Sequence, residues 1–378
     1  MDFTLSEAQD ELGGLARKIL AGRGVAGHGV RGVPGGAERP PGLAEWDTPD
    51  RQWADLAAAG VLAAGLPETL GGAGLGLLEH CSVLTEIGRA TSEVPYLASI
   101  VLGAGAIAEF GSPDQQDRWA GPAGRGSVVL TAALSEEDGD DPRFPSTQAE
   151  RAGGRWRLSG VKTAVPAAPR ADLFLVPAAT PGGVVVFLVS PSEVTVEPQQ
   201  LTDFAEAGRV VLDGVTLDDD RVLGGPGQGT EITGWLVSLA TVGLCAMQAG
   251  VIERALELTA EYARNRVQFG RPIGSFQAVA QRLADAYIDV EAVRLTMWQA
   301  AWLLASGGEA GTAVATAKFW AADAGHRVAH TAVHVHGGLG IDMSYPVHRY
   351  FVAAKHHEFA LGGATEQLRR IGANLARP

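Results

Sequence analysis

Residues 262–285 read YARNRVQFGRPIGSFQAVAQRLAD and place a sharp break between two helical patterns. Apolar residues recur at three- and four-residue steps on both sides of the break, which is typical of amphipathic helices. Gly270, Pro272 and Gly274 favour a turn between the two patterns, and we expect Ser275 to cap the second helix. The stretch therefore predicts two helices joined by a short turn.

Three arginines, Arg264, Arg266 and Arg271, lie close to this turn and to the start of the second helix. Free backbone N–H groups and guanidinium groups in one place suit a phosphate or pyrophosphate. A solvated basic corner on an ordinary helical hairpin explains the same residues. The spacing alone leaves both interpretations open.

The order of residues in this stretch is more specific than its spacing. Arg266-x-Gln-Phe269-Gly-x-Pro-Ile-x-x-Phe-Gln277 resembles the signature of the acyl-CoA dehydrogenase family. In that family the hairpin reaches across a subunit boundary to the FAD of its neighbour. The resemblance thus implies FAD as the cofactor, with Arg266, Phe269 and Gln277 among its contacts.

Length and composition are those of a globular protein with several domains. The chain has 378 residues, of which 46% are hydrophobic, and we expect two or three domains. The net charge of −13 argues against nucleic acid as a partner, because phosphate binding requires a basic face. The two cysteines, Cys81 and Cys245, support neither a disulfide framework nor a metal cage.

Neither secretion nor a membrane span is expected. The first residues are acidic and contain no apolar segment of the kind that a signal peptide has, so we expect a cytoplasmic protein. Residues 232–252 carry no charge and are long enough to span a bilayer, but polar residues dilute them and no basic bias flanks them. We interpret them as a buried core helix.

The chain divides into three parts by its patterns. Residues 1–126 are predicted to be helical, residues 127–228 to form a small β domain, and residues 229–378 to be helical again. Within the β domain we expect a hairpin at Gly153-Gly154 and a turn at Asp213-Gly214. The resemblance implies the same order: an all-α N-terminal domain, a β-barrel or sandwich, and a C-terminal four-helix bundle, an α+β multidomain fold.

Two further stretches match FAD-binding segments of the family. His334-Val-His-Gly337-Gly338 resembles its Gln-x-x-Gly-Gly motif, with His334 in place of the Gln, and glycine lets backbone approach a cofactor closely. Leu134-Ser135-Glu-Glu matches a Val-Thr-Glu-Pro segment of the β domain. The resemblance implies that His334, Gly337, Gly338, Leu134 and Ser135 contact FAD.

One flavin-binding strand departs from the family pattern. Where the family has Lys-x-Trp-Ile-Thr-Asn, this chain has Lys162-Thr-Ala164-Val-Pro166-Ala. The Trp that covers the isoalloxazine and the Thr near its reactive nitrogen are both lost. How this chain would hold the flavin ring therefore stays open.

A row of histidines raises a metal-binding alternative. His326, His330 and His334 recur every four residues on one helical face, a spacing that can hold a metal, and Asp323 is near. Ordinary polar packing explains the row equally, and His334 already has a role in the FAD motif. We therefore predict no metal site.

The expected catalytic base is absent from both of its known locations. Removing the α-proton of an acyl-CoA requires a positioned, desolvated carboxylate, which the family supplies as a Glu in one of two places. The matching positions here are Gly362 and Ala240. Glu366 lies a little downstream, but a solvated helix residue is the simpler interpretation of it. No catalytic base is assigned.

Three functions remain compatible with the sequence. The first is a FAD-dependent acyl-CoA dehydrogenase that desaturates an acyl-CoA thioester and passes electrons to an electron-transfer flavoprotein, with a base from an unrecognised position. The second is a base-less structural subunit, because some family members with steroid-like or bulky substrates pair a base-bearing chain with a base-less one in a heterotetramer. The third is other flavin chemistry in a secondary pathway. In each case we expect a homo- or heterotetramer, because the FAD site is completed by a neighbour.

Overall fold

The N-terminal part is helical. The computed structural model describes residues 3–21, 49–137, 139 and 141–376. Between Tyr96 and Ala104 the helix is π-helical before it continues as α4. The longer elements are α1 (Glu7–Ala21), α2 (Pro49–Ala58), α3 (Leu77–Ala90), the π-helix (Tyr96–Ala104) and α4 (Gly105–Phe110), followed by short turns up to α6 (Gly121–Gly124).

The middle of the chain forms one mixed eight-stranded sheet in the order β6-β7-β3-β2-β4-β5-β8, with β1 parallel to β4. The strands are β1 (Leu130–Ala132), β2 (Gln148–Ala152), β3 (Arg155–Pro166), β4 (Leu173–Thr180), β5 (Gly183–Val189), β6 (Thr195–Gln200), β7 (Glu206–Leu217) and β8 (Val222–Leu223). The sheet curls around its own apolar core. The ring centroids of Trp156 on β3 and Phe187 on β5 are 5.4 Å apart, although β2 and β4 lie between these strands in the sheet. A flat sheet would hold them roughly 14 Å apart.

The strand pairing confirms one predicted turn and corrects the other. Gly153 and Gly154 join β2 to β3, as expected for the hairpin. Asp213-Gly214 is not a turn, because β7 continues through it. The register with β3 shifts there, so Gly214, with a φ of 64°, forms a bulge inside the strand. An Asp-Gly pair is compatible with both a turn and a β-bulge, so the local sequence could not distinguish the two.

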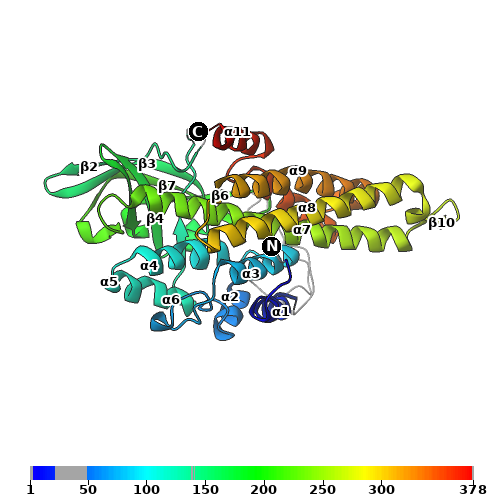
Figure 1. Ribbon diagram of the computed structural model, residues 1–378, viewed down its shortest axis with the longest axis horizontal. Coiled ribbons are helices and arrows are strands. Elements are labelled where there is room, and N and C mark those ends of the chain that lie inside the picture. The colour runs from blue at the N-terminus through cyan, green and yellow to red at the C-terminus, as the bar shows by residue number, and fades with distance from the viewer. Residues whose placement is uncertain (1–2, 22–48, 138, 140, 377–378) are drawn as a thin grey trace, which may run out of the picture.

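Five helices make up the C-terminal part. They are α7 (Gly229–Asn265), α8 (Gln277–Ala305), α9 (Gly311–His336), α10 (Pro346–Phe359) and α11 (Ala364–Leu375). Helices α7 to α10 pack against one another as the predicted bundle, and α11 lies on α9. Figure 1 shows the curled sheet at one end of the molecule and the α7–α8 turn, with β10, protruding at the other.

Helix α7 is the core helix of the molecule. In the part of the chain that the structure describes, it is the one helix long and apolar enough to cross a membrane, but 78% of its most apolar window is buried within the protein. It contacts α3, α8, α9 and α10. This burial agrees with the core helix that the sequence predicts for residues 232–252.

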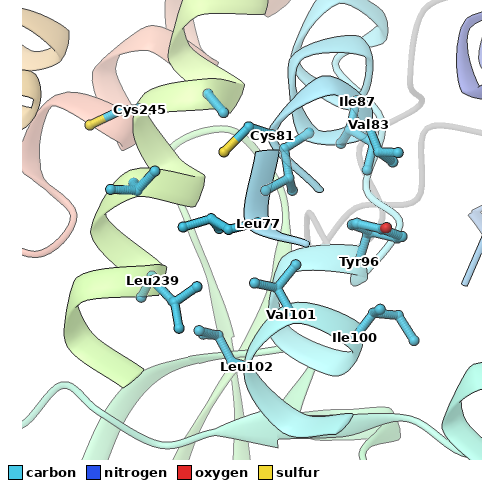
Figure 2. Close-up of a cluster of buried hydrophobic side chains, with 14 of the residues drawn as sticks. Leu77, Cys81, Val83, Ile87, Tyr96, Ile100, Val101, Leu102, Leu239 and Cys245 are labelled. Carbon is cyan, nitrogen blue, oxygen red and sulfur yellow. The ribbon is translucent and has the colours of Figure 1, made fainter. Parts of the chain in front are cut away.

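Two glycines allow α3 and α7 to cross closely. Figure 2 shows their apolar side chains packed together, with Leu77 and Cys81 from α3 beside Leu239 from α7. A Cβ on Gly250 would lie 1.9 Å from the carbonyl oxygen of Thr85, and one on Gly88 would lie 2.0 Å from that of Met247. Because backbone on both sides fills the space, neither position accepts a larger residue without separating the helices.

We predict that Gly250→Ala destabilises the protein by about 1–3 kcal/mol, because the methyl group overpacks a backbone contact. Gly234→Ala is the matched control on the same helix. No atom lies within 4 Å of a Cβ there, so Ala should stabilise by about 0.5–1 kcal/mol through its better helix propensity. Denaturant unfolding of both variants checks this, and equal effects would contradict the close crossing.

Candidate functional site

Six of the eight residues implied to bind FAD lie at the protruding end of the helical bundle. Arg266, Phe269 and Gln277 are exposed on the α7–α8 turn, where β9 (Val267–Gln268) pairs with β10 (Arg271–Pro272). Phe269 has a φ of 53° and is 92% exposed. A bulky apolar side chain is thus held in a sparsely populated backbone conformation and left in solvent.

Ser275 does not cap α8. The N-cap position is Phe276, and the hydroxyl of Ser275 instead donates to the carbonyl oxygen of Pro272 at 2.7 Å. The prediction was wrong because a short 3-10 turn, Ile273–Ser275, precedes the helix and takes up the serine. The first N–H groups of α8 therefore have no side-chain cap, as an anion-binding end requires.

The glycine pair that follows α9 lies beside the same turn. The ring of His336, the last residue of α9, stacks on Tyr262 of α7 with centroids 4.3 Å apart. Gly337 has a φ of 61°, and a Cβ on Gly337 or Gly338 would meet no atom within 4 Å. This open backbone and the exposed His334 complete the group at this end.

Leu134 and Ser135 lie elsewhere, in the wall of a cavity of about 1120 Å³. The cavity forms where the three parts of the chain meet. Leu97 comes from the N-terminal helices, Ala164 from β3 and Met247 from α7. The implied FAD residues thus form two groups, and one chain does not bring them into a single site.

Strained backbone is concentrated around this cavity. Among the described residues, six other than glycine have a positive φ, and five of them line the cavity. These five are Thr91, Ala164, Ala167, Phe204 and Leu361. Each costs on the order of 1–3 kcal/mol, and such residues cluster at ligand sites. The cavity wall is therefore shaped at the expense of local stability.

The two positions for a catalytic base carry no carboxylate. Ala240 of α7 lines the cavity, and Thr241 beside it donates its hydroxyl to the carbonyl of Val237. Near the other position, Leu361 rather than Gly362 lines the cavity. A Cβ on Gly362, whose φ is 96°, would collide with the carboxylate of Glu366. Glu366 itself pairs with Arg370 on α11 at 2.5 Å.

A polar group in the cavity wall was missed by sequence reasoning. Nδ1 of His356 on α10 lies 2.5 Å from Oδ2 of Asp203, in the loop between β6 and β7. Burial, the largest single effect, would raise the pKa of Asp203, but the hydrogen bond and charge of His356, with His357 and the backbone N–H of Ala205, together leave the pKa lowered. His357 beside it is buried, and burial lowers its pKa to about 3. Asp203 and His356 are separated by 153 positions in the sequence, so no local pattern brings them together.

The histidine row on α9 contacts charged side chains of α10. His326, His330 and His334 are exposed on one face, as predicted. Lys355 donates to Nδ1 of His326 at 2.8 Å, and Glu358 also lies against this ring. Among the described residues, metal-ligand spacing is found instead for Asp203, His356 and His357.

A buried ion pair holds the strand that lines the cavity. Lys162 Nζ lies 2.7 Å from Glu136 Oε1, with side chains 0% and 4% exposed. Burial alone would raise the pKa of Glu136, but Lys162 and the hydrogen bonds from Ser146 and Thr147 lower it to about 2. The pair ties the segment of Ser135 to the β3 residues beside Ala164.

Comparisons with known proteins extend over the whole chain. A family model described as acyl-CoA dehydrogenase, C-terminal domain, matches residues 227–376, and one described as acyl-CoA dehydrogenase, N-terminal domain, matches residues 37–127. Acyl-CoA dehydrogenase FadE27 of Mycobacterium tuberculosis is 48% identical over 100% of this chain and 99% of its own length.

Two solved structures are similar over nearly their full length. The ChsE4-ChsE5 complex from Mycobacterium tuberculosis contains a chain with 48% identity and a TM-score of 0.89, with 100% of both chains covered. A variant of the Tcur3481-Tcur3483 steroid ACAD contains a chain with 39% identity and a TM-score of 0.87, with 99% of both chains covered. Both structures contain two differently named proteins.

We predict that Glu136→Gln lowers the unfolding free energy at pH 7 by about 3–5 kcal/mol, because Lys162 stays buried without its counter-charge. Glu137→Gln is the control: its own side chain is exposed and its partner Arg209 is partly exposed, so the loss should stay below about 1 kcal/mol.

The same pair predicts a pH dependence. The pKa of Glu136 in the folded protein is below its ordinary value of 4.5. Its contribution to the free energy of unfolding is therefore fully present above pH 4.5 and is lost as the pH falls towards 2. Denaturant unfolding between pH 6 and pH 3 should therefore give a shallower decline for Glu136→Gln than for wild type. Identical slopes would show that the pair does not titrate with folding.

Proposed function

Because the chain belongs to the acyl-CoA dehydrogenase family, a family of oxidoreductases, we propose that it is the base-less subunit of a heteromeric, FAD-dependent acyl-CoA dehydrogenase. The observation that carries this proposal is the cavity wall. Ala240 and Gly362 occupy the two positions of the family's proton-abstracting Glu, and neither has a carboxylate. Ala240 and Leu361, the neighbour of Gly362, line the cavity instead, and the φ of 96° at Gly362 disfavours any side chain there. A second, related chain supplies the base.

Three of the four acidic residues that line the cavity are bound to basic side chains and are poorly suited to replace it; the fourth is Glu93. Asp203 is bound to His356, and its lowered pKa makes it a weaker base than an ordinary carboxylate. Asp50 and Glu206 lie on either side of Arg170, at 2.9 and 3.6 Å from its nitrogens. These contacts favour the base-less subunit over a dehydrogenase with an unrecognised base.

The protruding end of the chain fits the nucleotide part of FAD. Arg266 offers a guanidinium fork, Phe269 an exposed ring, and Gly337-Gly338 backbone that a ligand can approach closely. In the partner's site these groups would hold and orient the cofactor. FAD supplies a hydride acceptor when bound, and an electron-transfer flavoprotein would reoxidise it.

This chain's own cavity is less suited to a flavin ring. Ala164 and Pro166 offer neither an aromatic face nor a hydroxyl, and Gln199 accepts the backbone N–H of Ala164 at 2.8 Å. Exposed apolar residues on α8, Tyr287 and Ile288, indicate a surface that a second subunit covers. The family's cofactor site is therefore complete only in an assembly.

The similar structures support a partner and a substrate class. One is a complex of ChsE4 with ChsE5, and the other is a Tcur3481-Tcur3483 steroid ACAD. By analogy, we propose a heterotetramer with a related, Glu-bearing chain and a bulky, steroid-type acyl-CoA thioester as substrate.

Co-expression tests the proposal directly. We expect the chain purified alone to contain little flavin and to lack dehydrogenase activity. Co-expressed with a related chain that has Glu at the position matching Ala240 or Gly362, it should give a yellow heterotetramer that acyl-CoA bleaches anaerobically. A yellow homotetramer of this chain that an acyl-CoA bleaches would overturn the proposal in favour of an unrecognised base.

Arg266→Ala in this chain should weaken flavin binding by the assembly about 10- to 100-fold, the effect of losing one hydrogen bond to a charged group. Arg264→Ala is the matched control, an exposed arginine on the same turn that does not match the family motif, and we expect a change of at most about threefold. Flavin titration of the apo-assembly measures both. Equal effects would mean that the turn acts only through its overall charge.

A further inference from the structure

The group in the cavity wall joins two parts of the fold. Asp203 lies in the loop between β6 and β7, and His356 and His357 lie on α10 of the bundle. Phe204 of the same loop, with a φ of 65°, stacks on His348, which lies about two turns earlier on α10; the ring centroids are 6.3 Å apart. The loop therefore crosses from the sheet to the bundle at one defined place.

The orientation of His357 is set by a buried amide. Gln248 Nε2 donates to the carbonyl oxygens of Ala321 and Ala354, at 3.0 and 3.3 Å. Its Oε1 must then be the acceptor for Nδ1 of His357, 3.1 Å away. Nδ1 thus carries the proton, and the lone pair of Nε2 remains available. Metal-binding histidines usually have their other nitrogen held in this way.

Asp203 is held from two sides. The backbone N–H of Ala205 donates to Oδ1 at 3.1 Å, and Oδ2 lies 2.5 Å from Nδ1 of His356. The carboxylate and the two imidazoles each offer a ligand atom within 4.8 Å of the others. Nearby Lys318 is directed away from the rings, because its ammonium donates to the carbonyl oxygens of His357 and Glu358.

We propose that Asp203, His356 and His357 bind one divalent metal ion of the zinc class. Two neutral imidazoles and one carboxylate are the ligands that zinc takes in open, three-ligand sites. The metal would replace the proton shared by Asp203 and His356, which is released to solvent. All three residues line the cavity, so a fourth position faces it and can take water or an oxygen of a bound ligand.

The metal would join the β6–β7 loop to α10. In its absence this connection consists of the Asp203–His356 hydrogen bond and the Phe204–His348 stack. A metal bound only in the folded state raises thermal stability by an amount that grows with the logarithm of the ratio of free metal concentration to Kd. The inference does not rest on the proposed function, because it concerns a wall that either a base-less or an active chain would have.

The test is zinc and cobalt titration of the full chain, in the assembly in which it purifies, after treatment with chelator. We expect one Zn²⁺ per chain, a rise in melting temperature and the visible absorption of a four-coordinate Co²⁺ site. Asp203→Asn, which keeps the shape of the side chain, and His356→Gln should each weaken binding at least about tenfold.

The matched control is the double variant His326→Gln/His330→Gln. It removes the exposed histidine pair of α9, whose i,i+4 spacing could bind metal nonspecifically. We expect it to bind Zn²⁺ as wild type does. The inference is overturned if the double variant loses binding, if Asp203→Asn and His356→Gln retain it, or if wild type binds no Zn²⁺. Should Asp203→Asn fail to fold, His356→Gln and the wild-type cobalt spectrum decide.

Discussion

The length of α7 is the constraint on which the rest depends. The helix has 37 residues, and Ala240, in the cavity wall, is separated from Asn265, at the exposed turn, by about 38 Å of helix. Ser135 lines the same cavity as Ala240, whereas Arg266 directly follows Asn265 at the turn. In the proposed assembly, this rigid, buried helix makes the cofactor site a property of two chains.

Conformational cost is concentrated at the cavity and at the exposed α7–α8 turn. The positive φ values at Ala164, Phe204 and Leu361 shape the cavity, and the one at Phe269 presents its ring at the turn. Stability is supplied elsewhere, by the close crossing of α3 and α7 and by the buried Lys162–Glu136 pair. The cavity wall is ordered even where the family's catalytic Glu is missing, at Ala240 and Gly362. This agrees with the proposed role as a base-less subunit.

Local patterns predicted much of this fold. The apolar periodicity located α7, α8 and α9, and Gly153-Gly154 located a hairpin, because each depends on neighbouring residues. Asp213-Gly214 and Ser275 were misassigned because their conformations are decided by strand pairing and by a 3-10 turn. The order of residues in the family motifs predicted Arg266 and Gly337 as FAD contacts. Asp203 and His356 come together only in the tertiary fold, so no sequence motif predicts their contact.

The most direct test of the central claim is a structure of the co-expressed assembly with bound flavin. The account predicts that Arg266 and Phe269 of this chain contact a dinucleotide whose flavin ring lies in the cavity of the partner chain. It is contradicted if the α7–α8 turn points into solvent, or if the whole dinucleotide lies within this chain's own cavity.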